Sequence, residues 1–114
     1  MVSSKNRFHG LSSLRFVHKN GQTIRGQYFA IKSIVNNRRS VFRVAIVVSK
    51  KVSKLAVKRN RIRRRLYEAV RLQSKKICAP YDIVLMVYSD ELTDISAKDL
   101  NAQVKKLLKA AKII

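Results

Sequence analysis

Acidic residues are scarce in this sequence: six Asp and Glu stand against 26 Lys and Arg, a formal net charge of +20 over 114 residues. Self-repulsion of that size opposes a compact state unless a polyanion is usually close by. Yet 46% of the residues are hydrophobic, too many for a disordered basic chain. We expect a basic flexible tail over residues 1–9 and one folded domain over residues 10–114. Nucleic acid is the first candidate partner and an anionic membrane surface is the second.

Cysteine and long apolar runs are also nearly absent. Cys78 is the only cysteine, so no internal disulfide can form, and we expect it to be a small buried hydrophobe. The first twenty residues lack the apolar stretch of a secretory signal. The longest apolar run, residues 83–88, is far too short to span a membrane. These features favour a cytoplasmic protein without a membrane partner.

Residues able to do chemistry are few. His9 and His18 have no Cys or carboxylate at zinc-ligand spacing. Asp90, Glu91 and Asp94 could hold Mg²⁺, but acids placed before a helix more often stabilise its N-terminus, and we favour that interpretation. We therefore predict no catalytic residue and no metal site in this chain. If the protein takes part in catalysis, its partner carries the reactive centre.

The first part of the chain predicts a helix followed by strands. Residues 11–20 have helical spacing of apolar positions, with Ser12 or Ser13 as the N-terminal cap and Gly21 just past the end. Strand patterns follow over residues 23–35 and 40–49.

The polar turn that joins these two strand patterns, residues 36–39, predicts a hairpin between them. Gly26 could divide the first strand into two pieces.

The basic segment that follows predicts the main helix. Its expected buried face contains Leu55, Ile62, Leu66, Ala69, Val70 and Gln73. The expected outer face contains Arg61, Arg64, Glu68 and Arg71, with Asn60 and Tyr67 at its edge and with Arg59 and Arg65 beside the apolar stripe. This helix therefore combines an ordinary buried face with an unusually cationic outer face.

The last part of the chain predicts a buried strand and a second long helix. Residues 81–89 are almost continuously apolar, as in the interior of a sheet. Ser96 and Asp99 then have the spacing of a capping box. The apolar stripe that follows contains Ala97, Leu100, Val104, Leu107, Leu108 and Ala111. The expected order is α-β-β-α-β-α, with one more short strand possible early in the chain, in a single α+β domain.

The densest cationic stretch lies in the main helix. Six of the eight positions from Lys58 to Arg65 are cations, and Glu68 is the only acidic residue between Lys50 and Lys76. A charged run is usually a solvated face, but here the acids that would balance it are missing. The guanidinium fork also makes two-point phosphate contacts that Lys cannot copy. We favour RNA over DNA because no helix-turn-helix, zinc-finger or zipper pattern accompanies the stretch.

Two motifs carry a family resemblance. The tripeptide SKK, residues 49–51, is followed by AVKRNRIRRRL, residues 56–66. Together with the expected element order, these motifs resemble the protein subunit of bacterial ribonuclease P. The hallmark of that family is an Arg-Asn-Arg helix, matched here by residues 59–61, and Arg63 and Arg64 stand where the family has a basic pair.

The resemblance implies a ribonucleoprotein endonuclease that removes 5′ leaders from precursor tRNA. In that family the RNA subunit carries out the chemistry with Mg²⁺, and the signature helix lies against this catalytic RNA. The fold is expected to hold a central mixed sheet of about four strands, with a left-handed crossover around the signature helix. The residues expected to bind RNA are Lys50, Lys51, Lys58, Arg59, Asn60, Arg61, Arg63, Arg64 and Arg65.

The resemblance also implies a cleft for the single-stranded leader, between the first helix and the sheet. Its expected residues are Leu14, His18, Phe29 and Ile31. Leu14, His18 and Ile31 stand where aromatic residues are usual in the family. Stacking of a base on an aromatic ring contributes about 1–3 kcal/mol, so the missing rings are expected to weaken leader binding. The alternative to this family is a small basic ribosomal or other structural RNA-binding protein without an enzymatic role.

Overall fold

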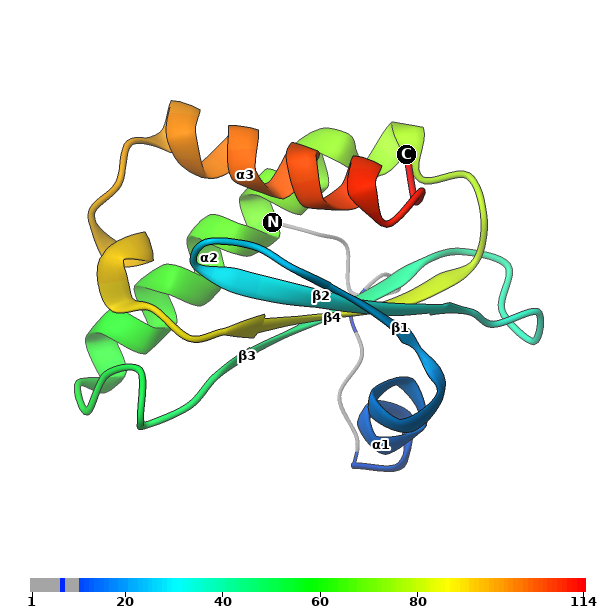
Figure 1. The fold of residues 1–114 in the computed structure, drawn as a ribbon, viewed down its shortest axis with the longest axis horizontal. Coiled ribbons are helices and arrows are strands. Elements are labelled where there is room, and N and C mark those ends of the chain that lie inside the picture. Colours follow the sequence, from blue (N-terminus) through cyan, green and yellow to red (C-terminus); the bar gives the residue numbers. More distant parts are fainter. Residues whose placement is uncertain (1–6, 8–10) are drawn as a thin grey trace.

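Four strands form one mixed sheet in the order β1-β2-β4-β3, as Figure 1 shows. The computed structural model describes Arg7 and residues 11–114, with residues 11–13 described through their backbone only. The elements are α1 (Leu11–Asn20), β1 (Gln22–Arg25), β2 (Phe29–Val35), β3 (Arg43–Val48), α2 (Ala56–Gln73), η2 (Ser74–Lys76), β4 (Tyr81–Val87), η3 (Asp90–Thr93) and α3 (Ala97–Ala110). The expected α+β class and element order, with the extra early strand, are confirmed.

The apolar strand β4 lies inside the sheet, as its sequence predicts. It pairs antiparallel with β2 and parallel with β3. Ile83 and Leu85 are fully buried on one face, and Val84 is buried on the other. A strand that is apolar on both faces is most stable when protein covers both of them.

The expected hairpin between the second and third strands is wrong. β2 and β3 are separated by β4, and the antiparallel hairpin is formed by β1 and β2 instead. Gly26 lies at the turn between these two strands, so the expected division of the first strand is confirmed. The physical reason is that the continuous apolar run of β4 needs a neighbour on each side, and the two β-branched strands β2 and β3 provide them.

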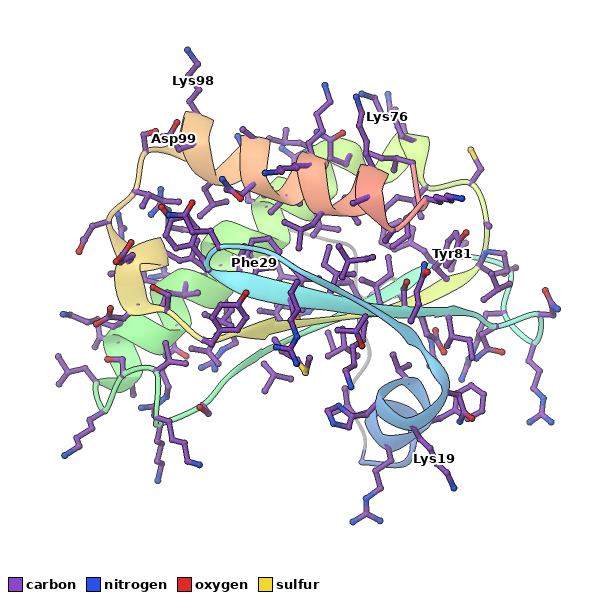
Figure 2. All side chains as sticks on the ribbon, viewed as in Figure 1. Lys19, Phe29, Lys76, Tyr81, Lys98 and Asp99 are labelled. Atoms are coloured by element: carbon purple, nitrogen blue, oxygen red, sulfur yellow. The ribbon has the colours of Figure 1, made fainter. Side chains whose placement is uncertain are left out.

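Helices cover both faces of the sheet (Figure 1). α2 and α3 lie on one face, and α1 lies on the other. The larger core cluster lies between the sheet and the α2/α3 layer, and a smaller cluster of Val17, Ala45 and Val84 lies under α1. All side chains of the described part are drawn in Figure 2, where Phe29 lies at the sheet.

The connection β3–α2–β4 is a crossover between two neighbouring parallel strands. It brings the cationic helix back over the sheet, which is the arrangement expected around the signature helix. The left-handed sense of this crossover stays a prediction from the family resemblance.

The observed ends of α1 agree with the sequence prediction at the C-terminus of the helix only. The helix begins at Leu11, so Ser12 and Ser13 lie inside it and the expected cap is wrong. At the other end the Gly21 N–H donates to the Val17 carbonyl oxygen at 2.8 Å. A Cβ on residue 21 would lie 2.7 Å from that oxygen, which explains why glycine follows the helix here. Apart from Arg7, the expected tail of residues 1–9 lies outside the described residues.

Three residues in or near α2 differ from expectation. Leu55 precedes the helix and is 59% exposed, because α2 begins one residue later. Tyr67 is only 5% exposed and belongs to the main core, although its helical position suggested the outer edge. Cys78 is exposed in the segment before β4, so it is not a buried hydrophobe.

The start of α3 is confirmed as a capped helix end. The Asp99 N–H donates to the Ser96 hydroxyl oxygen at 3.1 Å. The stripe of α3 is buried from Leu100 onward, whereas Ala97 in the first turn is exposed. No helix within the part of the chain that the structure describes is long and apolar enough to cross a membrane.

Candidate nucleic-acid interface

The cations of α2 surround its buried stripe and differ in exposure. Ile62 and Leu66 anchor the helix on the sheet with no exposed surface. Of the expected RNA-binding residues, the exposed ones are Lys50, Lys51, Lys58, Asn60, Arg61 and Arg64, and the half-buried ones are Arg59, Arg63 and Arg65. The structure thus places all nine on α2 or in the turn before it, but it does not give them equal access to solvent.

Arg65 binds the protein itself. Its Nη1 donates to the carbonyl oxygens of Leu92 at 2.8 Å and Thr93 at 3.0 Å, and its Nη2 donates to the Ile95 carbonyl oxygen. Burial lowers the pKa of this guanidinium, and the nearby Arg61 charge lowers it further. These carbonyls lie where η3 ends, so the helix itself does not satisfy them. Arg65 therefore fastens η3 to α2 by hydrogen bonds, and the expectation that it also binds RNA stays a prediction.

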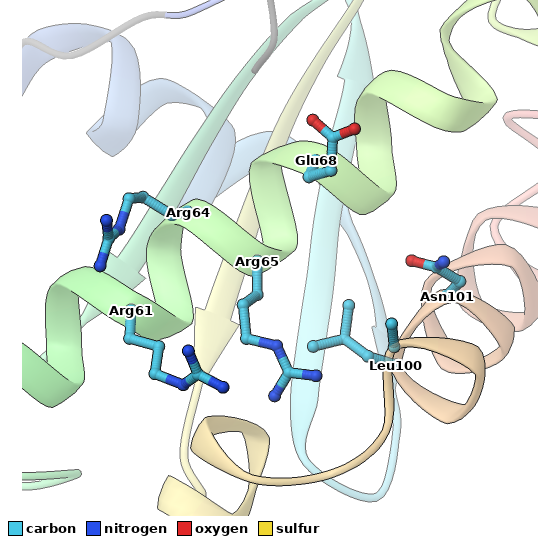
Figure 3. A pocket seen from close by; sticks show the side chains of 7 residues that line it. Arg61, Arg64, Arg65, Glu68, Leu100 and Asn101 are labelled. Carbon is cyan, nitrogen blue, oxygen red and sulfur yellow. The ribbon is translucent and has the colours of Figure 1, made fainter.

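Arg61 makes one contact of the same kind. Its Nε donates to the Thr93 carbonyl oxygen at 2.8 Å, while the residue as a whole stays exposed. Figure 3 shows the side chains of Arg61 and Arg65 both directed toward the η3 segment, whereas Arg64 extends to the other side of α2. Arg64 is therefore better placed than Arg65 for a ligand outside the protein.

A cavity of about 350 Å³ lies between α2 and the start of α3 (Figure 3). Its lining residues are Arg61, Arg64, Arg65, Glu68, Ala97, Leu100 and Asn101. Glu68, the only acid of α2, is paired with Arg71, whose Nε lies 3.0 Å from both carboxylate oxygens. This contact is the largest of several causes that together lower the pKa of Glu68 to about 2. The carboxylate is therefore held by a neighbour one turn away.

The remaining arginines of the signature are held by short local contacts. Arg59 Nη1 donates to the Ser53 carbonyl oxygen at 2.8 Å, which ties α2 to the turn before it. Arg63 Nη2 donates to the Asn60 side-chain oxygen one turn earlier. Asn60 therefore orients a guanidinium, a role that its position between two arginines in the sequence did not reveal.

A second groove lies between α1 and the sheet, with a volume of about 400 Å³. It is lined by Leu14, Arg15, His18, Lys19, Val47, Val84 and Met86. The sheet side is apolar, and α1 supplies the cationic and polar side chains. Leu14 and His18 thus lie where the leader cleft was expected.

Phe29 and Ile31 do not line this groove, and that part of the expectation is wrong. Both have no exposed surface and belong to the main core beneath α2 and α3. Successive side chains of a strand point to opposite faces, so Ile34, at odd spacing from both, packs toward α1 instead. The groove contains Val47 and Met86, which the sequence analysis missed. The alternation of β3 and β4 would have indicated them if the position of α1 had been known.

Comparison with known proteins decides the family. The family model described as Ribonuclease P matches residues 2–112. The chain belongs to the ribonuclease P protein family. A ribonuclease P protein component from Clostridioides difficile is 40% identical over 112 residues, which cover 95% of this chain and 96% of that protein. A ribonuclease P protein component from Pseudanabaena is 32% identical over 118 residues, covering 100% of this chain and 97% of that protein.

Solved structures agree with this assignment. The Staphylococcus aureus RNase P protein matches with a TM-score of 0.83 at 25% identity, covering 95% of this chain and 96% of that chain. The Thermotoga maritima RNase P protein matches with a TM-score of 0.81 at 24% identity, covering 91% of this chain and 96% of that chain, and supports the fold alone. The chain is thus a subunit of the ribonuclease that processes the 5′ ends of tRNA, and the ribosomal alternative is not favoured.

Proposed function

We propose that this chain binds the catalytic RNA subunit of ribonuclease P through the cations of α2 and of the turn before it. The observation that carries the proposal is the cationic surface of that helix, whose one carboxylate is already paired with Arg71. The proposed contacts are Lys50, Lys51, Lys58, Arg61, Arg63 and Arg64. RNA phosphates would offset the mutual repulsion of these side chains, and counterion release would make the binding strongly salt-dependent.

The groove under α1 is proposed to hold the single-stranded leader of precursor tRNA. Leu14, Val47 and Met86 offer apolar contacts for bases, while Arg15 and Lys19 bring positive charge to the same groove. A cationic groove with an apolar side is the usual arrangement for single-stranded nucleic acid. Because this groove lies on the opposite face of the sheet from α2, one chain could contact the catalytic RNA and the leader at the same time.

The protein's contribution would be positioning and charge neutralisation. No group of three or more His, Cys, Asp or Glu among the described residues is arranged to hold a metal ion. The Mg²⁺ that supports hydrolysis is therefore proposed to bind the RNA, and no step of the reaction is assigned to a side chain of this protein. The cytoplasm, where precursor tRNA and the catalytic RNA meet, is the proposed site of action.

Reconstitution tests this function. The purified chain, freed of RNA, is expected to leave precursor tRNA intact at every Mg²⁺ concentration, whereas addition of the catalytic RNA at moderate salt should give cleavage at the mature 5′ end. The matched variant Asp90→Ala/Glu91→Ala/Asp94→Ala should keep this activity, because these acids are not proposed to hold the metal. Cleavage by the protein alone that the triple variant abolishes would contradict the proposal.

A further inference from the structure

Tyr88 presents an exposed aromatic ring at the end of the sheet. It directly follows β4 and is 47% exposed. Among the described residues, Phe16 is the only other aromatic residue with comparable exposure, and it lies on α1 without lining the groove. The surroundings of Tyr88 distinguish it from a ring that is merely left on the surface.

Tyr88 is held in place through both its backbone and its hydroxyl group. Its N–H donates to the Tyr28 carbonyl oxygen at 3.1 Å. Its hydroxyl donates to the Gly26 carbonyl oxygen and lies 3.2 Å from the Phe29 carbonyl oxygen. These contacts fasten the ring to the turn between β1 and β2 and to the first residue of β2. A side chain that is ordered before binding loses less conformational entropy when a ligand contacts it.

Strand β4 leads from the groove under α1 to Tyr88. Val84 and Met86 line the groove, whereas Val87 is buried in the main core on the other face. Because successive side chains of an extended strand point to opposite faces, Tyr88 lies on the side of Val84 and Met86. Exposure increases along this row, from buried Val84 through half-buried Met86 to exposed Tyr88. At about 3.3 Å per residue, Tyr88 lies roughly 13 Å along the strand from Val84.

Two exposed cations follow the neighbouring strand beside this ring. Val48 of β3 and Val87 of β4 are register partners in the parallel pair. Lys50 and Lys51 therefore begin the next turn close to Tyr88. Both lysines are already proposed to contact the catalytic RNA. Tyr88 thus lies between that turn and the groove, so RNA that continues from one to the other would pass over this ring.

A third cation lies at the opposite edge of the same face. Arg25 of β1 pairs with Ala30 of β2, which pairs in turn with Met86 of β4. Residues directly opposite each other in neighbouring strands lie on the same face of the sheet, so the exposed Arg25 lies on the face of Met86. An aromatic ring on an apolar surface with cations beside it is the arrangement that binds single-stranded nucleic acid by base stacking.

We infer that Tyr88 is a stacking platform for one base of the 5′ leader, just beyond the groove under α1. This inference rests on the function proposed for that groove. Since every base has a π-face, the contact would add affinity for a leader without selecting its sequence. The strand would thereby provide aromatic surface that α1 lacks at Leu14 and His18.

Affinity for precursor tRNA with and without a leader tests this contact. The reconstituted holoenzyme is used, and the leader contribution is the ratio of the two dissociation constants. Tyr88→Leu should reduce this ratio about fivefold or more, the effect of losing one stacked base, and should leave the affinity for leaderless tRNA unchanged. Tyr88→Phe loses the hydroxyl contacts but keeps the ring, so it should retain most of the ratio. Equal losses in these two variants would overturn the stacking contact.

Phe16→Leu is the matched control, because it removes a ring of similar exposure that does not line the groove. It should leave the leader contribution unchanged. A reduction as large as that of Tyr88→Leu would overturn a specific role for Tyr88. Tyr88→Leu and Tyr88→Phe lose the same hydroxyl contacts, so the comparison between them separates stacking from any change in stability.

A fluorescent base locates the contact on the leader. 2-Aminopurine placed at successive leader positions loses fluorescence when it stacks on a ring. At one position it should be quenched by the wild type and by Tyr88→Phe but not by Tyr88→Leu. If no position depends on the ring in this way, the inference is overturned. A wild type without any leader contribution would overturn the groove and Tyr88 together, whereas a contribution that Tyr88→Leu leaves intact would overturn Tyr88 alone.

Discussion

Arg43 and Asp82 form a two-point ion pair between the parallel strands β3 and β4. Arg43 Nε donates to Asp82 Oδ1 and Nη2 donates to Oδ2, both at 2.8 Å. Asn36 Nδ2 also donates to Asp82 Oδ2, at 2.9 Å. The Arg43 and Asp82 side chains are 12% and 2% exposed, and the hydrogen bond to Asp82 raises the pKa of Arg43. Because Arg43 and Asp82 are also register partners, the pair fixes the alignment of the two strands that the α2 crossover connects.

Removal of Asp82 should strongly destabilise the fold. Asp82→Ala would leave a largely buried guanidinium without its carboxylate, a change that costs about 3–5 kcal/mol of unfolding free energy. Urea unfolding monitored by circular dichroism measures the loss. The paired change Arg43→Met/Asp82→Leu should recover most of it, because apolar side chains can replace a buried ion pair. A loss below about 1 kcal/mol in Asp82→Ala would show that the pair does not secure the register.

Arg64 and Arg65 are adjacent in the sequence but should respond differently to substitution. Arg65→Ala removes three hydrogen bonds to the end of η3 and should lower the unfolding free energy by about 1.5–3 kcal/mol. Arg64→Ala should change stability by less than about 0.5 kcal/mol. In contrast, Arg64→Ala should reduce the slope of log affinity for the catalytic RNA against log salt by roughly one unit. An unchanged salt slope in Arg64→Ala would remove this residue from the RNA interface.

A ring in the groove under α1 should strengthen leader binding. Leu14→Phe places an aromatic surface beside Val47 and Met86, and stacking of one base would contribute about 1–3 kcal/mol. Affinities for precursor tRNA with and without a leader isolate this effect. The comparison variant Ile31→Tyr should not improve leader binding, because Ile31 is buried on the opposite face and a larger ring there costs about 1–3 kcal/mol of stability. Equal gains from both variants would contradict the placement of the groove.

The ion pair of Glu68 predicts a dependence of stability on acid pH. The pKa of this carboxyl falls from its ordinary 4.5 to about 2, and the hydrogen bond from Arg71 is the largest cause. A carboxyl whose pKa is depressed on folding stabilises the protein above its unfolded pKa, and this contribution is lost as pH falls toward the folded value. The difference in urea midpoint between wild type and Glu68→Gln should therefore shrink from about pH 5 to about pH 2.5. A constant difference across this window would show that the pair does not stabilise the fold.

Several features of the molecule followed from the sequence alone. The periodicity of residues 11–20 predicted α1, and the continuous apolar run around Ile83 and Leu85 predicted the interior strand β4. The spacing of Ser96 and Asp99 predicted the cap of α3. These signals are local: each depends on contacts within a few residues or on the solvation of one segment. The cationic motif of α2 identified the family for the same reason, since its charges are contiguous in the chain.

Tertiary structure decided the neighbours of each element and therefore the composition of each site. The insertion of β4 between β2 and β3 replaced the expected hairpin, because strand order depends on which pairing buries the most apolar surface in the whole sheet. In this sheet Ile31 faces the main core, away from α1. Met86 and Val47, from two other strands, line the groove. A helical wheel places residues on one helix but contains no information about the elements that pack against it.

Arg65 and Tyr67 show this difference within the signature helix itself. The sequence determined that both lie on a cationic helix, and it placed Arg65 beside the apolar stripe and Tyr67 at the outer edge. In the folded chain the Arg65 guanidinium donates hydrogen bonds to the carbonyl oxygens at the end of η3. Arg7, sixty positions earlier in the sequence, lies over the Tyr67 ring. Charge and hydrophobic periodicity are properties of the linear sequence and can be determined from it directly. Which donor meets which acceptor depends on distances between segments, and only the folded chain sets those distances.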